Sequence, residues 1–260
     1  DKLSVRILDQ ENKKILINNY KNSKKRLFLL DYDGTLTGFT PKIDDARPDS
    51  ELYKILDNLI KNSNNKIVIV SGRNKDSLSK FFDKRDITLV AEHGAWIKQS
   101  YANNWTPLAD LNIEWKKEIM PILEYYVDIT PKSFIEDKSL SLVWHYRNSD
   151  LDLATIRLKE LKGTLVSTVA NLNLGIMDGH RVLEVKNLEY DKGKTSHKLI
   201  KEDSYDFILA AGDDTTDEDI FDVVTPYDYG YSIKIGLENS KAKFNLKNYF
   251  FPLTTRFATA

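Results

Sequence analysis

Short, continuous apolar runs recur along the chain, and several of them end in small or acidic residues. Such runs are typical of strands that are buried on both faces of a sheet. They predict core strands at residues 27–30, 66–70, 87–91, 207–211 and 232–235. Between these runs, apolar residues recur at helical spacing, most clearly in Ser50–Ile60. The alternation of strands and helices predicts an open α/β sheet.

The pattern changes from about Leu111 onward. Helical spacing in Ile113–Val127 and Leu151–Leu161 is interspersed with strand-like segments, which lie at residues 133–136, 140–145, 164–170, 174–177 and 181–185. Runs of paired strands with separate helices are typical of an α+β unit. We therefore predict two domains, a core of residues 1–110 plus 187–260 and an inserted domain of residues 111–186.

Two carboxylates, Asp31 and Asp33, follow the first apolar run, and Gly34 comes directly after them. Residues two apart on an extended backbone point to the same side, and the glycine permits a sharp turn. Two carboxylates this close require a cation between them or a shared proton. Two solvated loop acids are the simpler alternative, but four buried-type residues before the pair favour a site at the carboxyl end of a strand.

A second acidic segment, Asp213–Asp219, follows the apolar run at 207–211 and contains five carboxylates. Some of them could serve the N-terminus of a following helix. Hard oxygen ligands without soft ones favour magnesium over zinc or copper. Asp213 and Asp214 are therefore candidate magnesium ligands.

Three further positions lie where strands end or helices begin. Ser71 ends the run at 66–70 and precedes Gly72 and Arg73, so its hydroxyl could bind a phosphate or simply cap a helix. His93 follows the run at 87–91, where either a structural or a site-lining role is open. Lys192 stands at a glycine-bearing helix entry and could neutralise a phosphate, with Lys194 as the alternative.

The composition excludes several classes of function. The net charge is −1, from 38 basic and 39 acidic residues, so neither nucleic acid nor an anionic membrane is an expected partner. The absence of cysteine excludes disulfides and thiolate metal sites and is compatible with a cytoplasmic protein. No apolar stretch approaches the roughly 20 residues needed to span a bilayer. The charged start is not a signal peptide and lacks methionine, which suggests a part of a longer protein.

The string D-Y-D-G-T-L at Asp31–Leu36 resembles the signature of the haloacid dehalogenase superfamily of phosphatases. The resemblance implies a Rossmann-like core in which Asp31 is the nucleophile and Asp33 the general acid/base. It also implies that Ser71 and Lys192 hold the phosphate. Magnesium would then be bound by the Asp31 carboxylate, the Asp33 carbonyl, Asp213 and, through water, Asp214.

Longer strings resemble the trehalose-6-phosphate phosphatase family, and they are S-G-R, A-E-H-G-A, I-E-D-K-S-L-S-L-V-W-H-Y-R, L-E-V-K and G-D-D-T-T-D-E-D. The start of the chain also resembles the phosphatase part of a fungal enzyme. The family resemblance implies hydrolysis of trehalose-6-phosphate in the cytoplasm. It also implies an upstream trehalose-phosphate synthase region or subunit as a partner. It further implies that the inserted domain is a cap over the sugar. The implied substrate-binding residues are Arg73, His93, Glu136, Lys138, Arg147 and Glu184.

Two alternatives remain open at this stage. One is another sugar phosphatase or a phosphomannomutase of the same architecture, acting on sucrose phosphate or a mannosyl compound. The other is a catalytically silent subunit that binds a phosphosugar, against which the intact Asp31, Asp33, Lys192 and Asp213 argue. Phosphate release from a panel of sugar phosphates distinguishes them.

Overall fold

The computed structural model describes residues 4–38, 46–108, 112–247 and 257. The chain divides into two compact units. The first combines Asp1–Leu108 with Asp191–Ala260, and the second is Ala109–Tyr190. The second unit is thus an insertion between two segments of the first.

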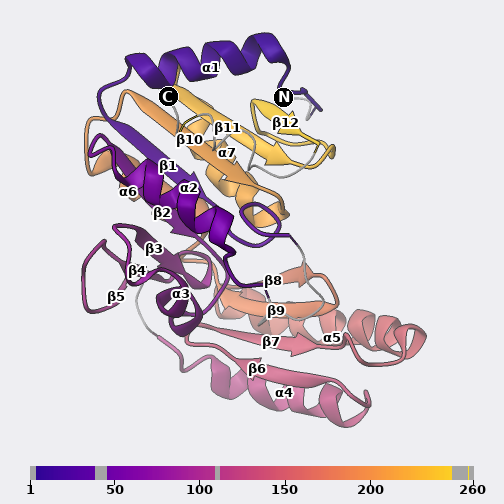
Figure 1. Ribbon diagram of the computed structural model, residues 1–260. Coiled ribbons are helices and arrows are strands. Elements are labelled where there is room, and N and C mark those ends of the chain that lie inside the picture. Colours follow the sequence, from indigo (N-terminus) through magenta and orange to yellow (C-terminus); the bar gives the residue numbers. More distant parts are fainter. Residues whose placement is uncertain (1–3, 39–45, 109–111, 248–256, 258–260) are drawn as a thin grey trace. The chain divides into compact units, whose positions relative to one another are not determined.

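The first unit is built on an eight-stranded sheet with the order β12-β11-β10-β1-β2-β3-β4-β5 (Figure 1). The strands from β12 to β3 pair in parallel, whereas β4 and β5 are antiparallel additions at one edge. The bounds are β1 Arg26–Leu30, β2 Asn65–Val70, β3 Thr88–Ala91, β4 Trp96–Lys98, β5 Thr106–Pro107, β10 Phe207–Gly212, β11 Gly230–Ile235 and β12 Phe244–Leu246. The parallel centre confirms the predicted α/β fold, and the strands predicted at 27–30, 66–70, 87–91, 207–211 and 232–235 are all present.

Helices cover both faces of this sheet. All five residues of β1 are therefore buried, whichever face their side chains point to. Phe28 and Leu30 pack in a cluster with residues of α1, α2 and α3. Leu27 and Leu29 point to the other face and pack with residues of α6 and α7. The helices are α1 Gln10–Asn22, α2 Ser50–Ile60, α3 Lys75–Phe82, α6 Lys192–Lys201 and α7 Glu218–Val224, with short 3₁₀ turns η2 Glu92–Gly94 and η3 Thr215–Asp217.

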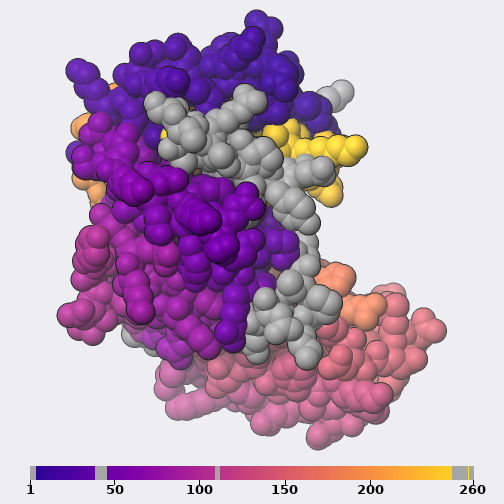
Figure 2. Space-filling model, in the orientation of Figure 1, coloured from indigo at the N-terminus to yellow at the C-terminus, as the bar shows by residue number. Residues whose placement is uncertain are grey.

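The segment that leads into α1 pairs with the far edge of the same sheet. The backbone amide of Leu8 donates to the Asn245 carbonyl over 2.9 Å, and α1 buries Leu16 and Tyr20 against the body. In the space-filling view α1 (indigo) and the β12 region (yellow) lie side by side (Figure 2). Helix α1 is therefore an integral part of the core unit.

The second unit contains a four-stranded antiparallel sheet with the order β6-β7-β9-β8 and two helices (Figure 1). Its elements are α4 Lys116–Asp128, β6 Phe134–Asp137, β7 Ser141–His145, α5 Leu151–Asn171, β8 Leu174–Gly179 and β9 Val182–Asn187. One hydrophobic cluster joins Trp144 and Leu183 of the sheet to Leu123 of α4 and Leu161 of α5. The helices thus cover one face of this sheet.

The strand predicted at residues 164–170 is wrong, because α5 continues through this segment to Asn171. Thr164, Val166 and Thr168 alternate with other residues as in a strand, which produced the prediction. The buried positions are instead Leu161, Leu165 and Val169, which recur every four residues and face the cluster of the second unit. Packing of that helical stripe outweighs the β propensity of the branched residues.

Candidate active site

Asp31 lies directly after β1, at the centre of the parallel sheet. Its backbone amide donates to the Ala211 carbonyl of β10 over 2.9 Å, so the backbone is still held in the sheet at the point where the carboxylate begins. The chain then turns back over Gly34, whose φ of 83° lies in the left-handed region. As a result, Asp31 is only 4% exposed and its side chain cannot move away from the end of the strand.

Lys192 brings a positive charge to this carboxylate from the start of α6. The Asp191 side chain caps that helix by accepting from the Lys194 amide, which places Lys192 in the first turn. Its ammonium donates to Asp31 Oδ1 over 2.8 Å and to Asp217 Oδ1 over 2.7 Å. Burial alone would lower the pKa of Lys192, but Asp217 and Asp31 raise it well above its usual value. Lys192 therefore stays protonated, whereas the Lys194 side chain is exposed and its ammonium lies 3.6 Å from Asp191 Oδ2.

The positive charge of Lys192 does not balance the negative charges around Asp31. Burial, followed by the charges of Asp217 and Asp213, raises the pKa of Asp31, although Lys192 acts in the opposite direction. Asp31 Oδ2 is buried and accepts no hydrogen bond from the described part of the protein. A buried carboxylate oxygen without a donor is a position at which an additional cation or a reacting phosphorus atom would be stabilised.

A cluster of three carboxylates meets the requirements for a hard divalent cation. Asp31, Asp213 and Asp217 each offer an oxygen, and these oxygens lie within 4.8 Å of one another. Burial and the neighbouring Asp217 and Asp214 raise the pKa of Asp213 to about 7. Excess negative charge, a free Asp31 oxygen and an all-oxygen donor set fit magnesium, as the sequence predicted.

Asp217 organises the turn that carries Asp213. Its Oδ2 atom accepts from the amides of Asp213 and Asp214 over 2.9 and 3.1 Å, while Oδ1 receives Lys192. The turn passes so close to Gly212 that a Cβ atom there would lie 2.3 Å from Asp217 Cγ. Gly212 is thus required for Asp217 to reach the site.

Asp214 contributes differently from the neighbouring Asp213. Its Oδ1 atom accepts from the amide and the hydroxyl of Thr216 over 2.8 and 2.6 Å, which fixes the first turn of η3. Burial would raise the pKa of Asp214, but Lys192 and the Thr216 hydroxyl lower it to about 2. Its carboxylate is not part of the three-residue cluster of the described chain, so magnesium binding through water stays a prediction.

Arg73 holds Asp33 in a bidentate ion pair. Arg73 Nε lies 2.8 Å from Asp33 Oδ2, and Nη2 lies 2.6 Å from Oδ1. The guanidinium is 4% exposed and lies over the rings of Tyr32 and Phe81 at 5.2 and 5.5 Å. In the structure Arg73 fixes the orientation of Asp33, and its expected contact with substrate stays a prediction.

Ser71 and His93 lie beside this pair. Ser71 is buried at the end of β2, and its hydroxyl accepts from the Arg73 amide over 3.1 Å. His93 adopts a left-handed backbone with φ of 57°, and its amide donates to the Ser71 carbonyl over 3.0 Å. Its imidazole packs so closely on Gly72 that an added Cβ would lie 2.5 Å from Cε1.

The remaining predicted residues lie in the second unit. Glu136 and Glu184 both pair with Val143 across β6-β7-β9, so they share the sheet face that α4 and α5 leave uncovered. Lys138 follows β6 and acts on Glu136 by its charge. The Nε2 atom of His145 lies 2.8 Å from Glu136 Oε2, and this contact is the main reason that the pKa of Glu136 is lowered.

Arg147 lies just beyond β7 in the same unit. Its carbonyl accepts from Arg181 Nη1 over 3.3 Å, which ties the loop after β7 to the turn between β8 and β9. The open face of the second unit carries Glu136, Glu184 and His145, a mixture of groups that can both accept from and donate to hydroxyl groups.

Comparisons with known proteins decide the family. The family model of trehalose-phosphatase matches residues 29–252, which cover the second unit and most of the first. The chain belongs to the trehalose-phosphatase family. The predicted family resemblance and the predicted haloacid dehalogenase-like fold are thereby confirmed.

Individual trehalose-phosphatase relatives support the assignment. Trehalose-phosphatase of Saccharomyces cerevisiae is 36% identical over 232 residues, covering 81% of this chain and 26% of the relative. The bifunctional trehalose-6-phosphate synthase/phosphatase of Thermoproteus tenax is 34% identical and covers 95% of this chain and 33% of the relative. The chain thus spans about a quarter to a third of these curated relatives.

The solved C-terminal domain of C. albicans trehalose-6-phosphate phosphatase is similar over the whole chain. It has a TM-score of 0.87 and 31% identity, and the match covers 100% of this chain and 98% of that domain. An Aspergillus fumigatus trehalose-6-phosphate phosphatase structure has a TM-score of 0.74 at 30% identity, with 98% of each chain covered. Among the described residues, no helix is both long and apolar enough to cross a lipid bilayer.

Two residues of this trehalose-phosphatase family member were missed by sequence reasoning. For Asp217 the sequence suggests only a possible role at a helix N-terminus, although its distance of four residues from Asp213 allows both carboxylates to reach one point through a turn. His145 stands out in the sequence only as part of the string W-H-Y-R. In the structure it lies in β7 opposite Phe134, and Phe134 is two residues from Glu136 along β6. Only the pairing register reveals that contact.

Proposed function

We propose that this chain hydrolyses trehalose-6-phosphate to trehalose and inorganic phosphate. Membership of the trehalose-phosphatase family supports this substrate. The observation that carries the chemistry is the environment of Asp31: a buried carboxylate has one oxygen on Lys192 and the other without a hydrogen-bond donor in the described chain. An oriented oxygen of this kind suits a nucleophile.

In the proposed first step, Asp31 Oδ2 attacks the phosphorus atom and the bond from phosphorus to the sugar oxygen breaks. Asp33 gives a proton to that leaving oxygen, so trehalose departs neutral and Asp31 carries the phosphoryl group. Both carboxylate oxygens of Asp33 accept from Arg73 in the structure, so the contact at one of them must loosen when that oxygen carries this proton. The ion pair therefore describes the site before substrate arrives.

In the second step, a water oxygen attacks the phosphorus atom of the aspartyl-phosphate while Asp33 takes a proton from that water. The bond from Asp31 to phosphorus breaks, and phosphate leaves with Asp31 restored as a carboxylate. Lys192 stabilises negative charge on Asp31 and on the transferred oxygens in both steps, because it stays protonated between two carboxylates. Asp217 keeps the ammonium in place.

Magnesium would be held by Asp31 and Asp213, with the Asp33 carbonyl and a water on Asp214 completing the predicted set. Asp217 fits a supporting place, since both of its oxygens already accept hydrogen bonds. A bound magnesium ion would neutralise the phosphate oxygens and the excess carboxylate charge.

The sugar would be recognised by the second unit. Glu136 and Glu184 can accept hydrogen bonds from sugar hydroxyls, and Lys138 can donate one. His145 holds Glu136 ionised, which favours this acceptor role. We retain His93 and Arg147 as proposed additional sugar contacts, and the domain as a proposed cap.

The proposal is tested by phosphate release from trehalose-6-phosphate, sucrose-6-phosphate and mannose-6-phosphate, each with magnesium or with excess chelator. We expect rapid release from trehalose-6-phosphate with magnesium only. Asp31→Asn keeps the volume of the side chain but removes the nucleophile, so it should abolish turnover, whereas the exposed Asp228→Asn should not. Equal rates on all three sugars, or activity in Asp31→Asn with deamidation excluded, would contradict the proposal.

A cytoplasmic location and an upstream synthase region or subunit stay predictions. The Thermoproteus tenax relative, a bifunctional trehalose-6-phosphate synthase/phosphatase, supports the second of these predictions.

A further inference from the structure

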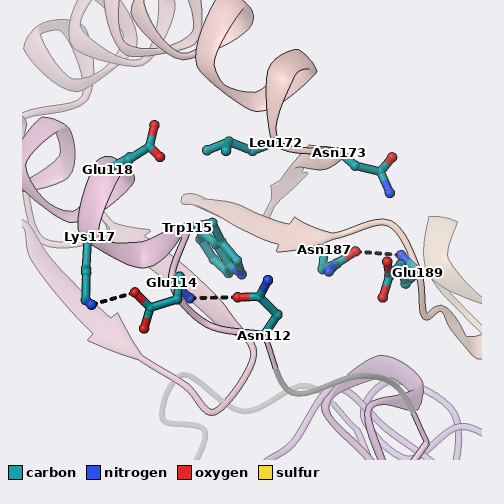
Figure 3. A pocket seen from close by; sticks show the side chains of 9 residues that line it. All are labelled: Asn112, Glu114, Trp115, Lys117, Glu118, Leu172, Asn173, Asn187 and Glu189. Atoms are coloured by element: carbon teal, nitrogen blue, oxygen red, sulfur yellow. Dashed lines mark hydrogen bonds and ion pairs between the residues drawn. The ribbon is translucent and has the colours of Figure 1, made fainter.

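The second unit contains a pocket of about 400 Å³ that lies outside the residues proposed to act on phosphate or sugar (Figure 3). Its walls come from the start of α4, the turn after α5 and the end of β9. None of Glu136, Lys138, Arg147 and Glu184 lines it. A volume of this size is in the range of small-molecule sites.

Trp115 provides the first observation that points to a ligand. Its side chain lines the pocket and is 6% exposed as a residue, and the indole Nε1–H has no hydrogen-bond partner in the described part of the chain. In Figure 3 the ring stands in the middle of the pocket, with its nitrogen directed toward the side of Asn112 and Asn187. A buried N–H without an acceptor costs free energy, which a ligand carrying an acceptor oxygen would recover.

The charges of the pocket disfavour anionic ligands. The ammonium of Lys117 pairs with Glu114 over 2.5 Å, so these two charges compensate each other. Glu118 and Glu189, both exposed, remain, and in Figure 3 they lie on opposite sides of Trp115. The resulting negative charge repels phosphorylated sugars and other anions. It also attracts cations, but a cation has no lone pair to accept the Trp115 N–H.

A hydroxyl group satisfies both requirements, because it accepts from an N–H and donates to a carboxylate at the same time. The amide of Asn187 adds donor capacity, since its Oδ1 atom already accepts from the Glu189 backbone over 2.8 Å. The flat Trp115 ring and Leu172 supply apolar surface for the C–H face of a sugar. We propose that this pocket binds a neutral sugar, of one or two rings, at a site separate from the phosphatase centre.

The test is calorimetric titration of the whole chain with glucose, maltose and trehalose. We expect saturable binding of at least one of them in the millimolar range. Trp115→Phe keeps the ring but removes the N–H, and it should weaken binding about threefold to tenfold, the effect of one hydrogen bond. Trp144→Phe is the matched control, because it removes another buried, unpartnered indole N–H from the same hydrophobic cluster without touching the pocket.

Substitutions at exposed pocket residues separate an effect on sugar binding from an effect on folding. Glu118→Gln with Glu189→Gln should weaken sugar binding as well, with an unchanged melting temperature. Binding should persist when Glu136 and Glu184 are both replaced by alanine, whatever happens to phosphatase activity in that variant. Loss of binding there would place the sugar on the open sheet face and overturn the proposal. Calcium binding that requires Glu118 and Glu189 without any sugar binding would also overturn it.

Discussion

The Lys192 ammonium lies 2.8 Å from Asp31 Oδ1, although 161 residues separate the two in sequence. Both side chains are almost completely buried, and Asp217 completes the contact from the other side of Lys192 at 2.7 Å. Three segments of the chain therefore meet at one charge cluster. Each member depends on the others, because an unpaired buried charge is expensive.

Lys192→Met tests this dependence. Removing the ammonium leaves Asp31 and Asp217 facing each other without compensation, so we expect a loss of about 3–5 kcal/mol in the free energy of unfolding. Turnover should fall at least about a hundredfold, as expected for loss of a preorganised charge. Denaturant unfolding and phosphate release measure the two effects. The exposed Lys194→Met is the matched control, and equal activity of the two variants would refute the assignment of Lys192.

Arg73→Lys tests whether Arg73 positions Asp33 or binds substrate. A lysine keeps the charge but cannot make the two parallel contacts to Asp33. We expect kcat to fall about tenfold or more with little change in KM, because the general acid/base loses its fixed orientation. Steady-state kinetics on trehalose-6-phosphate distinguish the possibilities. A higher KM at unchanged kcat would instead support the original prediction that Arg73 contacts substrate.

Asp213→Asn should change how stability depends on pH. Burial and neighbouring carboxylates raise the pKa of Asp213 from 3.8 to about 7 in the folded protein. Between these pH values the folded state binds more protons than the unfolded state, so stability from this group is full at low pH and is lost as pH rises to about 7. Asp213→Asn has no ionisable group at this position, so it does not lose this stability as the pH rises. In chelator it should therefore melt several degrees above wild type at pH 8 and close to it near pH 4.

Calorimetric melting over this pH range, with and without magnesium, measures the effect. Magnesium should stabilise wild type at pH 8 but stabilise Asp213→Asn much less, because the variant has lost a ligand. Asp228→Asn, an exposed position on the same unit, controls for the charge change. A wild-type melting temperature that rises from pH 4 to pH 8 in parallel with Asp213→Asn would contradict the argument.

The sugar-contact proposal predicts selective losses in the second unit. Glu136→Ala, Lys138→Ala and Glu184→Ala should each lower kcat/KM for trehalose-6-phosphate about tenfold to a thousandfold, the effect of one or two charged hydrogen bonds. Turnover of a small aryl phosphate should change far less. Glu124→Ala on the exposed side of α4 is the control. Equal losses on both substrates would assign these residues to folding or to the phosphate site.

Local patterns in the sequence were enough to locate the candidate active site. Four apolar residues before Asp31 can only be buried as a central strand, so the carboxylate had to emerge at the end of a parallel sheet. The same reasoning located Asp213 after β10, and the register of the sheet brings these two strand ends together. Local patterns suffice here because burial on both faces constrains each strand strongly.

Which polar groups meet could not be predicted from these local patterns. Arg73 could have faced a ligand or Asp33, and Asp217 could have capped a helix or joined Lys192, because both choices are compatible with the same local backbone. The contact of His145 with Glu136 likewise depends on the pairing of β6 with β7. In residues 164–170 the local preference for a strand yielded to the packing of Leu165 and Val169. Contacts between distant segments are set by the packing of whole elements, about which a local pattern carries little information.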